Sequence, residues 1–210
     1  MKRRILIALA VGSLVASASL AAGLAFRQPG GRVVQAAPSP YRGSVPPPGI
    51  RAPDFALPDY RGTLITMSAL RGSVVVLSFV DSKCKESCPI VAGVMARAVQ
   101  QLPTGVRHDV VPLLMSVNPN LDTPPRIHRF LARRRALMLR YLVGTVAQMR
   151  PIWKAYGVLP AVDTGNPNVH SSDVRIFDRT GIWVSTQHPG VDLTAANLEH
   201  DVLLALEKRR

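Results

Sequence analysis

Two cysteines, Cys84 and Cys88, are the residues of this sequence best suited to chemistry. They are the only cysteines among 210 residues, and they stand four positions apart in "DSKCKESCPI". Pro89 follows directly, and proline suits the first turn of a helix while it disfavours helical geometry in the residue before it. We therefore expect Cys88 to cap the N-terminus of a helix and Cys84 to lie in the preceding loop.

This position predicts two reactive sulfurs. The free N–H groups and partial positive charge of a helix N-terminus stabilise a thiolate and lower its pKa, and Lys83 and Lys85 act in the same direction. Two such sulfurs can close a disulfide or bind a soft metal ion. Thiolates select Cu(I) and Zn; one imidazole would complete a three-coordinate copper site, whereas zinc normally takes four ligands. A purely structural disulfide is the alternative, but so short a loop would stabilise the domain weakly.

A third ligand has to come from one of the histidines, which are His108, His128, His170, His188 and His200. His170, in "GNPNVHSSDVRIFD", precedes an expected strand. Ligands of a parallel α/β sheet bind at the carboxyl ends of its strands, so His170 reaches the cysteine loop only if its strand runs antiparallel. His188, in "STQHPG", is a second candidate. The other three are expected to be ordinary surface or core residues.

The elements that position these residues follow from hydrophobic periodicity. The β-branched run 73–80 predicts a buried central strand, and apolar residues at helical spacing over 89–102 predict the helix after it. Strands alternate with helices and end in a hairpin and a terminal helix, which predicts an α/β fold with a mostly parallel central sheet, an antiparallel edge hairpin and flanking helices. Two thiols between a strand and a helix are the thioredoxin-type arrangement, although the spacing here is C-x3-C rather than C-x2-C. The remaining expected elements are two short strands within 54–70, a strand over 108–118 made irregular by Pro112, an arginine-rich helix over 126–140, a helix over 145–156, strands over 172–178 and 181–187, and a helix over 193–206.

The formal net charge of +13 arises from 26 basic and 13 acidic residues. The basic residues are scattered, so we expect no nucleic-acid partner. The arginine-rich helix is expected to have a solvated basic side and an apolar side. The basic side comprises Arg126, Arg129, Arg133 and Arg140, and the apolar side comprises Ile127, Phe130, Leu131 and Leu137. Attraction to an anionic membrane surface would use the excess charge.

The N-terminus predicts a membrane segment. Lys2, Arg3 and Arg4 precede a stretch from 5 to 26 without a charged residue, which is long enough to cross a bilayer and also suits a long signal peptide. The basic start places the N-terminus in the cytoplasm. We expect an anchor over 1–27 in a bacterial-type inner membrane, a Pro/Gly-rich tether over 28–51, and a folded domain over 52–210 on the periplasmic side, released into the periplasm if the anchor is cleaved.

Several motifs taken together resemble the Sco/SenC copper-chaperone family over roughly residues 41–206. They are "APDFALPDYRG", "FVDSKCKESCP", "SVNPNLDTP", "WKAYGV" and "VHSSDVRIFDRTG". The resemblance implies a membrane-tethered, thioredoxin-like domain that helps to assemble the copper centre of cytochrome c oxidase. It implies copper as Cu(I) or Cu(II) bound by Cys84, Cys88 and His170. The implied partner is the copper-bearing oxidase subunit or another copper chaperone.

The sequence departs from the pattern of that family at four positions. Ser82 and Lys85 stand where the family usually has Thr and Pro, and Asn118 gives "VNP" in place of the commoner "VDP". Val169 replaces an acidic residue that often precedes the histidine. Lys85 and Val169 make the site less negative, which would disfavour a cation.

Three functions remain open at this stage. A metallochaperone would use all three ligands at an exposed site. A thiol–disulfide oxidoreductase would use Cys84 to attack and Cys88 to resolve the mixed disulfide, without any demand on His170. Peroxiredoxins share the "APDFALPDYRG" opening, but residues 79–83 lack the Pro and Thr that precede their reactive cysteine. We expect primarily a metallochaperone, with the reductase as its alternative.

Overall fold

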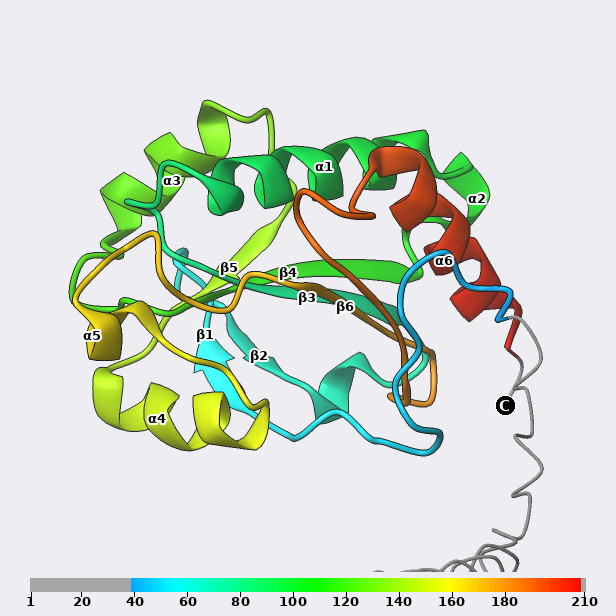
Figure 1. Ribbon diagram of the computed structural model, residues 1–210, viewed down its shortest axis with the longest axis horizontal. Helices are drawn as coiled ribbons and strands as arrows, with labels where there is room; N and C mark the ends of the chain where they lie inside the picture. The colour runs from blue at the N-terminus through cyan, green and yellow to red at the C-terminus, as the bar shows by residue number, and fades with distance from the viewer. Residues whose placement is uncertain (1–38, 209–210) are drawn as a thin grey trace, which may run out of the picture. The chain divides into compact units, whose positions relative to one another are not determined.

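The computed structural model describes residues 39–208; the anchor and the start of the tether, expected over 1–38, lie outside the described residues. A five-stranded sheet with the order β5-β4-β3-β6-β7 forms the centre (Figure 1). β3, β4 and β5 run parallel, while β6 is antiparallel to both β3 and β7. This confirms the expected fold class, with the antiparallel hairpin β6–β7 at one edge. The strands are β3 (Val74–Val80), β4 (Val110–Ser116), β5 (Arg140–Leu142), β6 (Val174–Phe177) and β7 (Trp183–Gln187).

The central strand β3 is buried on both faces, as its unbroken apolar run predicts. Alternate residues contribute to two separate cores: Val74 and Val76 face one, and Val75 and Leu77 face the other. The irregularity expected at Pro112 was wrong. β4 pairs with β3 in continuous register from Val110 to Ser116, and β5 pairs only from Leu113 onward, so Pro112 lies outside the pairing with β5.

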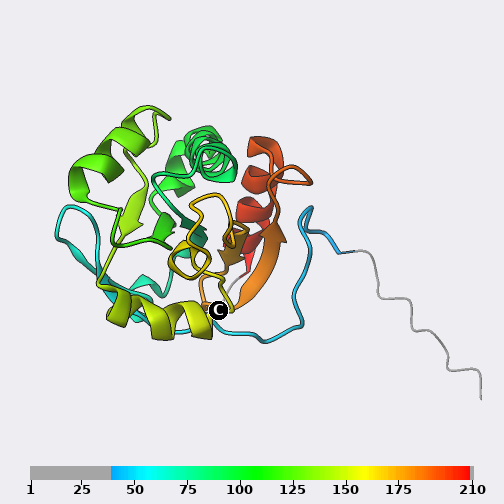
Figure 2. The same cartoon turned by 60° about the vertical axis from the view of Figure 1, so that its left-hand side comes forward.

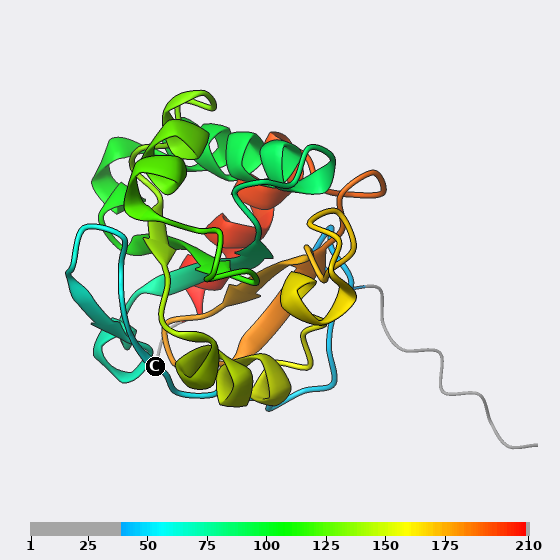
Figure 3. The same cartoon turned by 90° about the vertical axis from the view of Figure 1, so that its left-hand side faces the viewer.

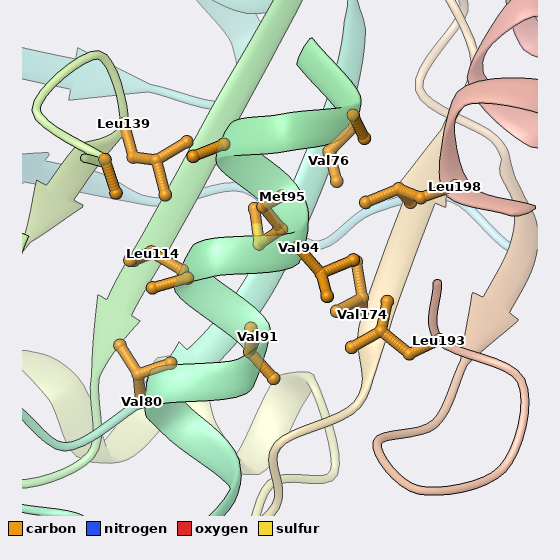
Figure 4. Close-up of a cluster of buried hydrophobic side chains, with 14 of the residues drawn as sticks. Val76, Val80, Val91, Val94, Met95, Leu114, Leu139, Val174, Leu193 and Leu198 are labelled. Carbon is orange, nitrogen blue, oxygen red and sulfur yellow. The ribbon is translucent and has the colours of Figure 1, made fainter. Parts of the chain in front are cut away.

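Helices cover both faces of this sheet (Figures 1 and 3). One core contains residues of α1 (Ser87–Gln101), α3 (Pro124–Ala132) and α6 (Ala195–Glu207). Figure 4 shows Val91, Val94 and Met95 of α1 in this core, between Leu114 of β4 and Leu198 of α6. The other core lies under α4 (Val146–Ala155) and a small antiparallel pair, β1 (Ala56–Pro58) and β2 (Leu64–Thr66). Short helical turns occur at η1 (Ser68–Leu70), α2 (Thr104–Arg107) and α5 (Ala161–Thr164). None of the helices within 39–208 is long and apolar enough to span a bilayer.

The arginine-rich helix is shorter than expected. α3 ends at Ala132, and Arg135 has a φ of 52°, in the left-handed region that a helix cannot continue through. Arg140 is therefore not on this helix but opens β5, and Leu137 is exposed rather than buried. The rest of the predicted apolar side, Ile127, Phe130 and Leu131, is buried as expected.

The segment before β1 is bonded to the sheet edge and to α6. The backbone amides of Arg42 and Gly43 donate to the carboxylate of Asp201, at 2.8 and 3.0 Å. Ser44 pairs with Thr186 of β7, and a side chain on Gly43 would collide with that strand. In Figure 2 this blue segment runs alongside the orange strand β7. Residues 42–51, which belong to the range expected to be a tether, thus lie against the folded domain.

Candidate metal centre

Three segments converge at the carboxyl end of β3. Cys84 lies in the loop after β3, and Cys88 lies in the first turn of α1. His170 precedes β6, which runs antiparallel to β3 with Val174 opposite Ser78. This reversed direction brings the start of β6 to the end of β3, the condition under which the sequence allowed His170 to reach the cysteines. In Figure 3 the gold loop before β6 lies next to the N-terminal end of α1.

The helix start differs from the prediction by two residues. The N-cap of α1 is Glu86, whose side chain makes no capping hydrogen bond, and Cys88 is the second helical residue rather than the cap. Pro89 still falls in the first turn, where its missing N–H costs no helical hydrogen bond. Cys88 consequently points from the helix into the core instead of standing at its tip.

The donor atoms of Cys84, Cys88 and His170 all lie within 4.8 Å of one another. Nε2 of His170 is 3.1 Å from Sγ of Cys88. Nδ1 of His170 lies 2.8 Å from the carbonyl oxygen of Ser171 and must donate to it, because a carbonyl can only accept. The neutral ring therefore carries its proton on Nδ1 and directs the lone pair of Nε2 toward the cysteines. None of the other described histidines joins this group.

Both cysteines are free thiols, and both are buried. Cys84 is 4% exposed and Cys88 is not exposed at all. The expectation of an exposed site at this loop was therefore wrong. The loop packs against the core on one side, and Cys84 lines a cavity described below.

The two sulfurs differ in acidity, so the prediction of a lowered pKa holds for Cys84 only. A hydrogen bond with Cys88 lowers the pKa of Cys84 to about 3, although burial opposes it. The same hydrogen bond, together with burial, raises the pKa of Cys88. Burial lowers the pKa of His170, but its interaction with Cys84 and its bond to Ser171 outweigh burial and raise it. The pair thus holds one thiolate, on Cys84, and one proton, on Cys88.

Two buried carboxylates, those of Asp81 and Asp122, accept hydrogen bonds from the backbone of the cysteine loop. Asp81 accepts from the amide of Lys83 at 2.7 Å and from Nδ2 of Asn118 at 2.9 Å. Asp122 accepts from the amide of Ser82 at 3.0 Å and from the hydroxyls of Ser116 (2.6 Å) and Tyr141 (2.7 Å). Burial, with Asp81 nearby, raises the pKa of Asp122 despite these bonds.

Sequence reasoning missed these supporting residues. Asn118 and Asp122 belong to the "SVNPNLDTP" motif, but the motif did not indicate what either residue does. Asn118 donates to Asp81, which gives the departure from "VDP" a structural use, since an aspartate there would face a second carboxylate.

One further contact joins the two halves of the site. Oδ1 of Asn168 accepts from the amide of Lys85 at 3.0 Å and so ties the histidine loop to the cysteine loop. The side chains of Lys85 and Val169 are exposed, so the two residues that make the site less negative stand on its outer side.

Comparison with known proteins places the chain among relatives of one family. The family model SCO1/SenC matches residues 46–200. A protein of Stutzerimonas stutzeri, provisionally named a copper-binding protein, is 29% identical over 133 residues, which are 61% of this chain and 65% of that protein. The chain thus spans somewhat less than two thirds of this relative. An SCO2-like protein of Rickettsia typhi is 23% identical over 150 residues, 69% of this chain and 72% of the relative.

Solved structures give the same fold. ScoI of Bradyrhizobium japonicum with copper bound superposes with a TM-score of 0.63 and 22% identity, over 75% of this chain and 100% of that one. Apo Sco1 of Thermus thermophilus superposes with a TM-score of 0.65 and 21% identity, over 79% of this chain and 97% of that one.

The mixed sheet with a dithiol where a central strand passes into a helix defines a thioredoxin-like domain. Within that class, the match over residues 46–200 shows that the chain belongs to the SCO1/SenC family.

Proposed function

We propose that this protein binds copper through Cys84, Cys88 and His170 and delivers it during the assembly of cytochrome c oxidase. One observation carries the proposal: two sulfurs and one imidazole nitrogen, from segments 82 residues apart in sequence, lie within 4.8 Å of one another. Membership of a family of cytochrome c oxidase assembly proteins supports the choice of process.

The donor set suits copper by type and by spacing. Thiolate and imidazole are the ligands that Cu(I) prefers, and three donors complete a trigonal Cu(I) site while leaving zinc one ligand short. With bonds of about 2.0–2.3 Å, as metal–nitrogen and metal–sulfur bonds are, donors of a trigonal site stand roughly 3.5–4 Å apart. The observed group needs only small side-chain movements to reach that spacing.

The residues around the ligands prepare them for the metal. Ser171 fixes the tautomer of His170, so in the neutral ring Nε2 carries the lone pair that a metal ion needs. Cys84 already has a low pKa, whereas Cys88 must give up its proton. Copper binding should therefore release a proton, taken up by solvent or buffer.

The location and the acceptor are part of the same proposal. Residues 1–27 anchor the protein in a bacterial-type inner membrane, and the domain works on the periplasmic side. The acceptor is the copper-bearing subunit of the oxidase or another copper chaperone. The uncharged stretch 5–26 behind three basic residues supports the location. Protease added to spheroplasts should digest the domain; a domain protected until lysis would refute this orientation.

A copper titration tests the ligand set. The reduced full chain, purified in a mild detergent, is titrated with Cu(I) against a competing chelator and with Cu(II) followed by its absorption. Cys84→Ser and Cys88→Ser should each abolish stoichiometric binding, and His170→Ala should weaken it at least about tenfold. His188→Ala is the matched control and should bind as the unaltered chain does. Binding unchanged in His170→Ala would refute the three-ligand site.

A thiol–disulfide reductase remains the second candidate, because the pair holds one thiolate beside one thiol. The Cys84 thiolate would attack a partner disulfide, forming a mixed disulfide and releasing one partner thiolate. Cys88 would then lose its proton to that thiolate and attack Sγ of Cys84, releasing the second partner thiolate. Two electrons pass to the partner, and Cys84–Cys88 becomes a disulfide. Single-turnover reduction of a disulfide peptide that survives His170→Ala, without copper binding, would favour this function.

A further inference from the structure

A strongly basic cavity opens beside Cys84. It has a volume of about 450 Å³, within the range of about 300–1,000 Å³ typical of ligand sites. The cysteine loop, residues 82–85, forms one wall. The other wall is formed by α3 and the residues that follow it, and we call the space the arginine cavity. Its arginines are Arg126, Arg129, Arg133 and Arg134.

The cations of the arginine cavity have no acidic partner in the described part of the chain. Six basic residues line it, the four arginines with Lys83 and Lys85, and no acidic residue does. None of the six forms a salt bridge within residues 39–208, although other arginines do, such as Arg150 with Asp163. A concave wall of one charge focuses the field and attracts the opposite charge.

Two buried polar atoms in the walls also lack a partner. Nε of Arg126 and Oγ of Ser82 are both shielded from solvent, and neither forms a hydrogen bond within the described residues. Buried polar groups are almost always hydrogen-bonded, so each such atom needs an explanation. Both residues line the arginine cavity, from opposite walls. Because both atoms are shielded from water, each side chain would have to turn toward the cavity before an acceptor of an occupant could pair with it.

We propose that the arginine cavity binds an acidic segment of the protein that exchanges metal or electrons with Cys84. The part that concerns exchange rests on the proposed function. Arginine presents a planar fork of donors that matches a carboxylate in two hydrogen bonds, and four arginines on one wall suit several carboxylates on one chain. Because Cys84 lines the same cavity, a bound segment would lie next to this residue.

The geometry favours a protein segment over a lipid surface. A flat bilayer could meet the exposed rim, made by Lys83, Lys85, Arg129 and Arg133. It could not enter the cavity, whereas an aspartate or glutamate side chain can enter a space of about 450 Å³ and approach Arg126 and Ser82. Binding to the rim alone would also leave both buried donors unpaired.

Fluorescence anisotropy tests the proposal on the copper-free, reduced full chain in a neutral detergent. The probe is a labelled peptide of alternating Glu and Gly, and its Gln counterpart is the control peptide. Arg126→Gln should weaken binding of the acidic peptide about tenfold, the loss of a charge-assisted hydrogen bond, and a triple variant at Arg126, Arg129 and Arg133 should abolish saturable binding. Lys154→Gln removes one charge from an exposed site on α4 and should change the affinity less than twofold.

Other outcomes would overturn the inference. Equal affinity for the Gln peptide would do so, as would equal effects of Arg126→Gln and Lys154→Gln. Arginine-dependent binding to phosphatidylglycerol vesicles without peptide binding would assign the surface to the membrane. Competition by free glutamate or phosphate as strong as that of the peptide would assign it to a small anion.

Copper titration of the same variants separates this inference from the metal site. The arginine variants should bind copper as the unaltered chain does, which also shows that they fold. Peptide binding without copper binding would refute the metal proposal alone. Copper binding with a peptide affinity indifferent to Arg126 would refute this inference alone. Arg126→Lys keeps the charge but not the fork, and it should recover only part of the affinity.

Discussion

Two buried aspartates, one beside the edge strand β7 and the other beside β4 and β5, show how differently the same side chain can be used. Asp201 of α6 accepts five hydrogen bonds, including the backbone amides of Arg42 and Gly43. Asp122, under the cysteine loop, accepts three and has Asp81 beside it. Burial acts to raise the pKa of both, but the bonds outweigh it at Asp201, whose pKa is lowered, and not at Asp122, whose pKa is raised.

The two aspartates therefore have different roles: Asp201 attaches a neighbouring segment to the domain, whereas Asp122 supports the cysteine loop. The ionised Asp201 is fully compensated by donors, so it fastens residues 42–43 to the edge of the domain. Burial disfavours the ionised form of Asp122, and its carboxyl group positions the amide of Ser82 next to the candidate metal centre. Charge in the second region is less well compensated, as expected where structure serves a reactive site.

The largest effect should come from removing the carboxylate of Asp201. Asp201→Ala leaves several buried donors without an acceptor, and we expect a loss of about 3–5 kcal/mol in the free energy of unfolding. Urea unfolding followed by circular dichroism measures it. Asp163→Ala, which breaks an exposed ion pair with Arg150, is the control and should cost less than about 1 kcal/mol. Similar losses in both variants would show that Asp201 does not fasten residues 42–43 to the domain.

A smaller loss is expected beside the candidate metal centre. Asp122→Asn replaces one acceptor oxygen by an NH2 group, which then faces a donor of Ser82, Ser116 or Tyr141. We expect a loss of about 2 kcal/mol in the free energy of unfolding. The same variant should also weaken copper binding, because Ser82 lies two residues before Cys84. Unaltered copper affinity would show that the loop keeps its geometry without this support.

Removal of one hydroxyl should have a smaller effect still. Tyr141→Phe keeps the ring packed in the core and deletes the hydrogen bond to Asp122, so we expect a loss of about 1 kcal/mol. Because this bond favours the ionised carboxylate, its loss should raise the pKa of Asp122 further. Unfolding measurements on Tyr141→Phe in the Asp122→Asn background should show a smaller loss. A fully additive result would mean that the two residues do not interact.

The two aspartates should also respond to acid with opposite sign. The pKa of Asp201 is lowered by folding, so its stabilisation is complete above the unfolded value of about 3.9 and is lost as the pH falls through the folded value. The pKa of Asp122 is raised, so the cost of its charge is relieved as the pH falls from neutral through that raised value toward about 3.9.

Unfolding measurements from neutral pH to about pH 4 resolve this difference. The stability gap between the unaltered chain and Asp122→Asn should widen on acidification, because only the unaltered chain gains from protonation. The gap to Asp201→Ala should stay constant over that range and close only below it. A gap that narrows for Asp122→Asn would refute the raised pKa.

The elements around the cysteines were predictable because their signals are local. The apolar run of β3, the helical spacing of α1 and the stereochemistry of Pro89 each act within a few residues. The end of α3 was missed because the arginine-rich pattern continues to Arg140, while the backbone leaves the helix at Arg135. The partners of Asp122 and Asp201 were missed because aspartate in a loop or on a helix carries no signal of what it will accept.

The sequence by itself determined where the reactive sulfurs stand in the chain, which strand and helix hold them, and which histidine could join them. Only the tertiary structure decided that they do meet, that both sulfurs are buried and unequal in acidity, and that the arginines of α3 form a wall beside Cys84. The reason is the distance along the chain: 82 residues separate Cys88 from His170, and 159 separate Arg42 from Asp201. Contacts of that range depend on strand order and direction, which hydrophobic periodicity does not encode.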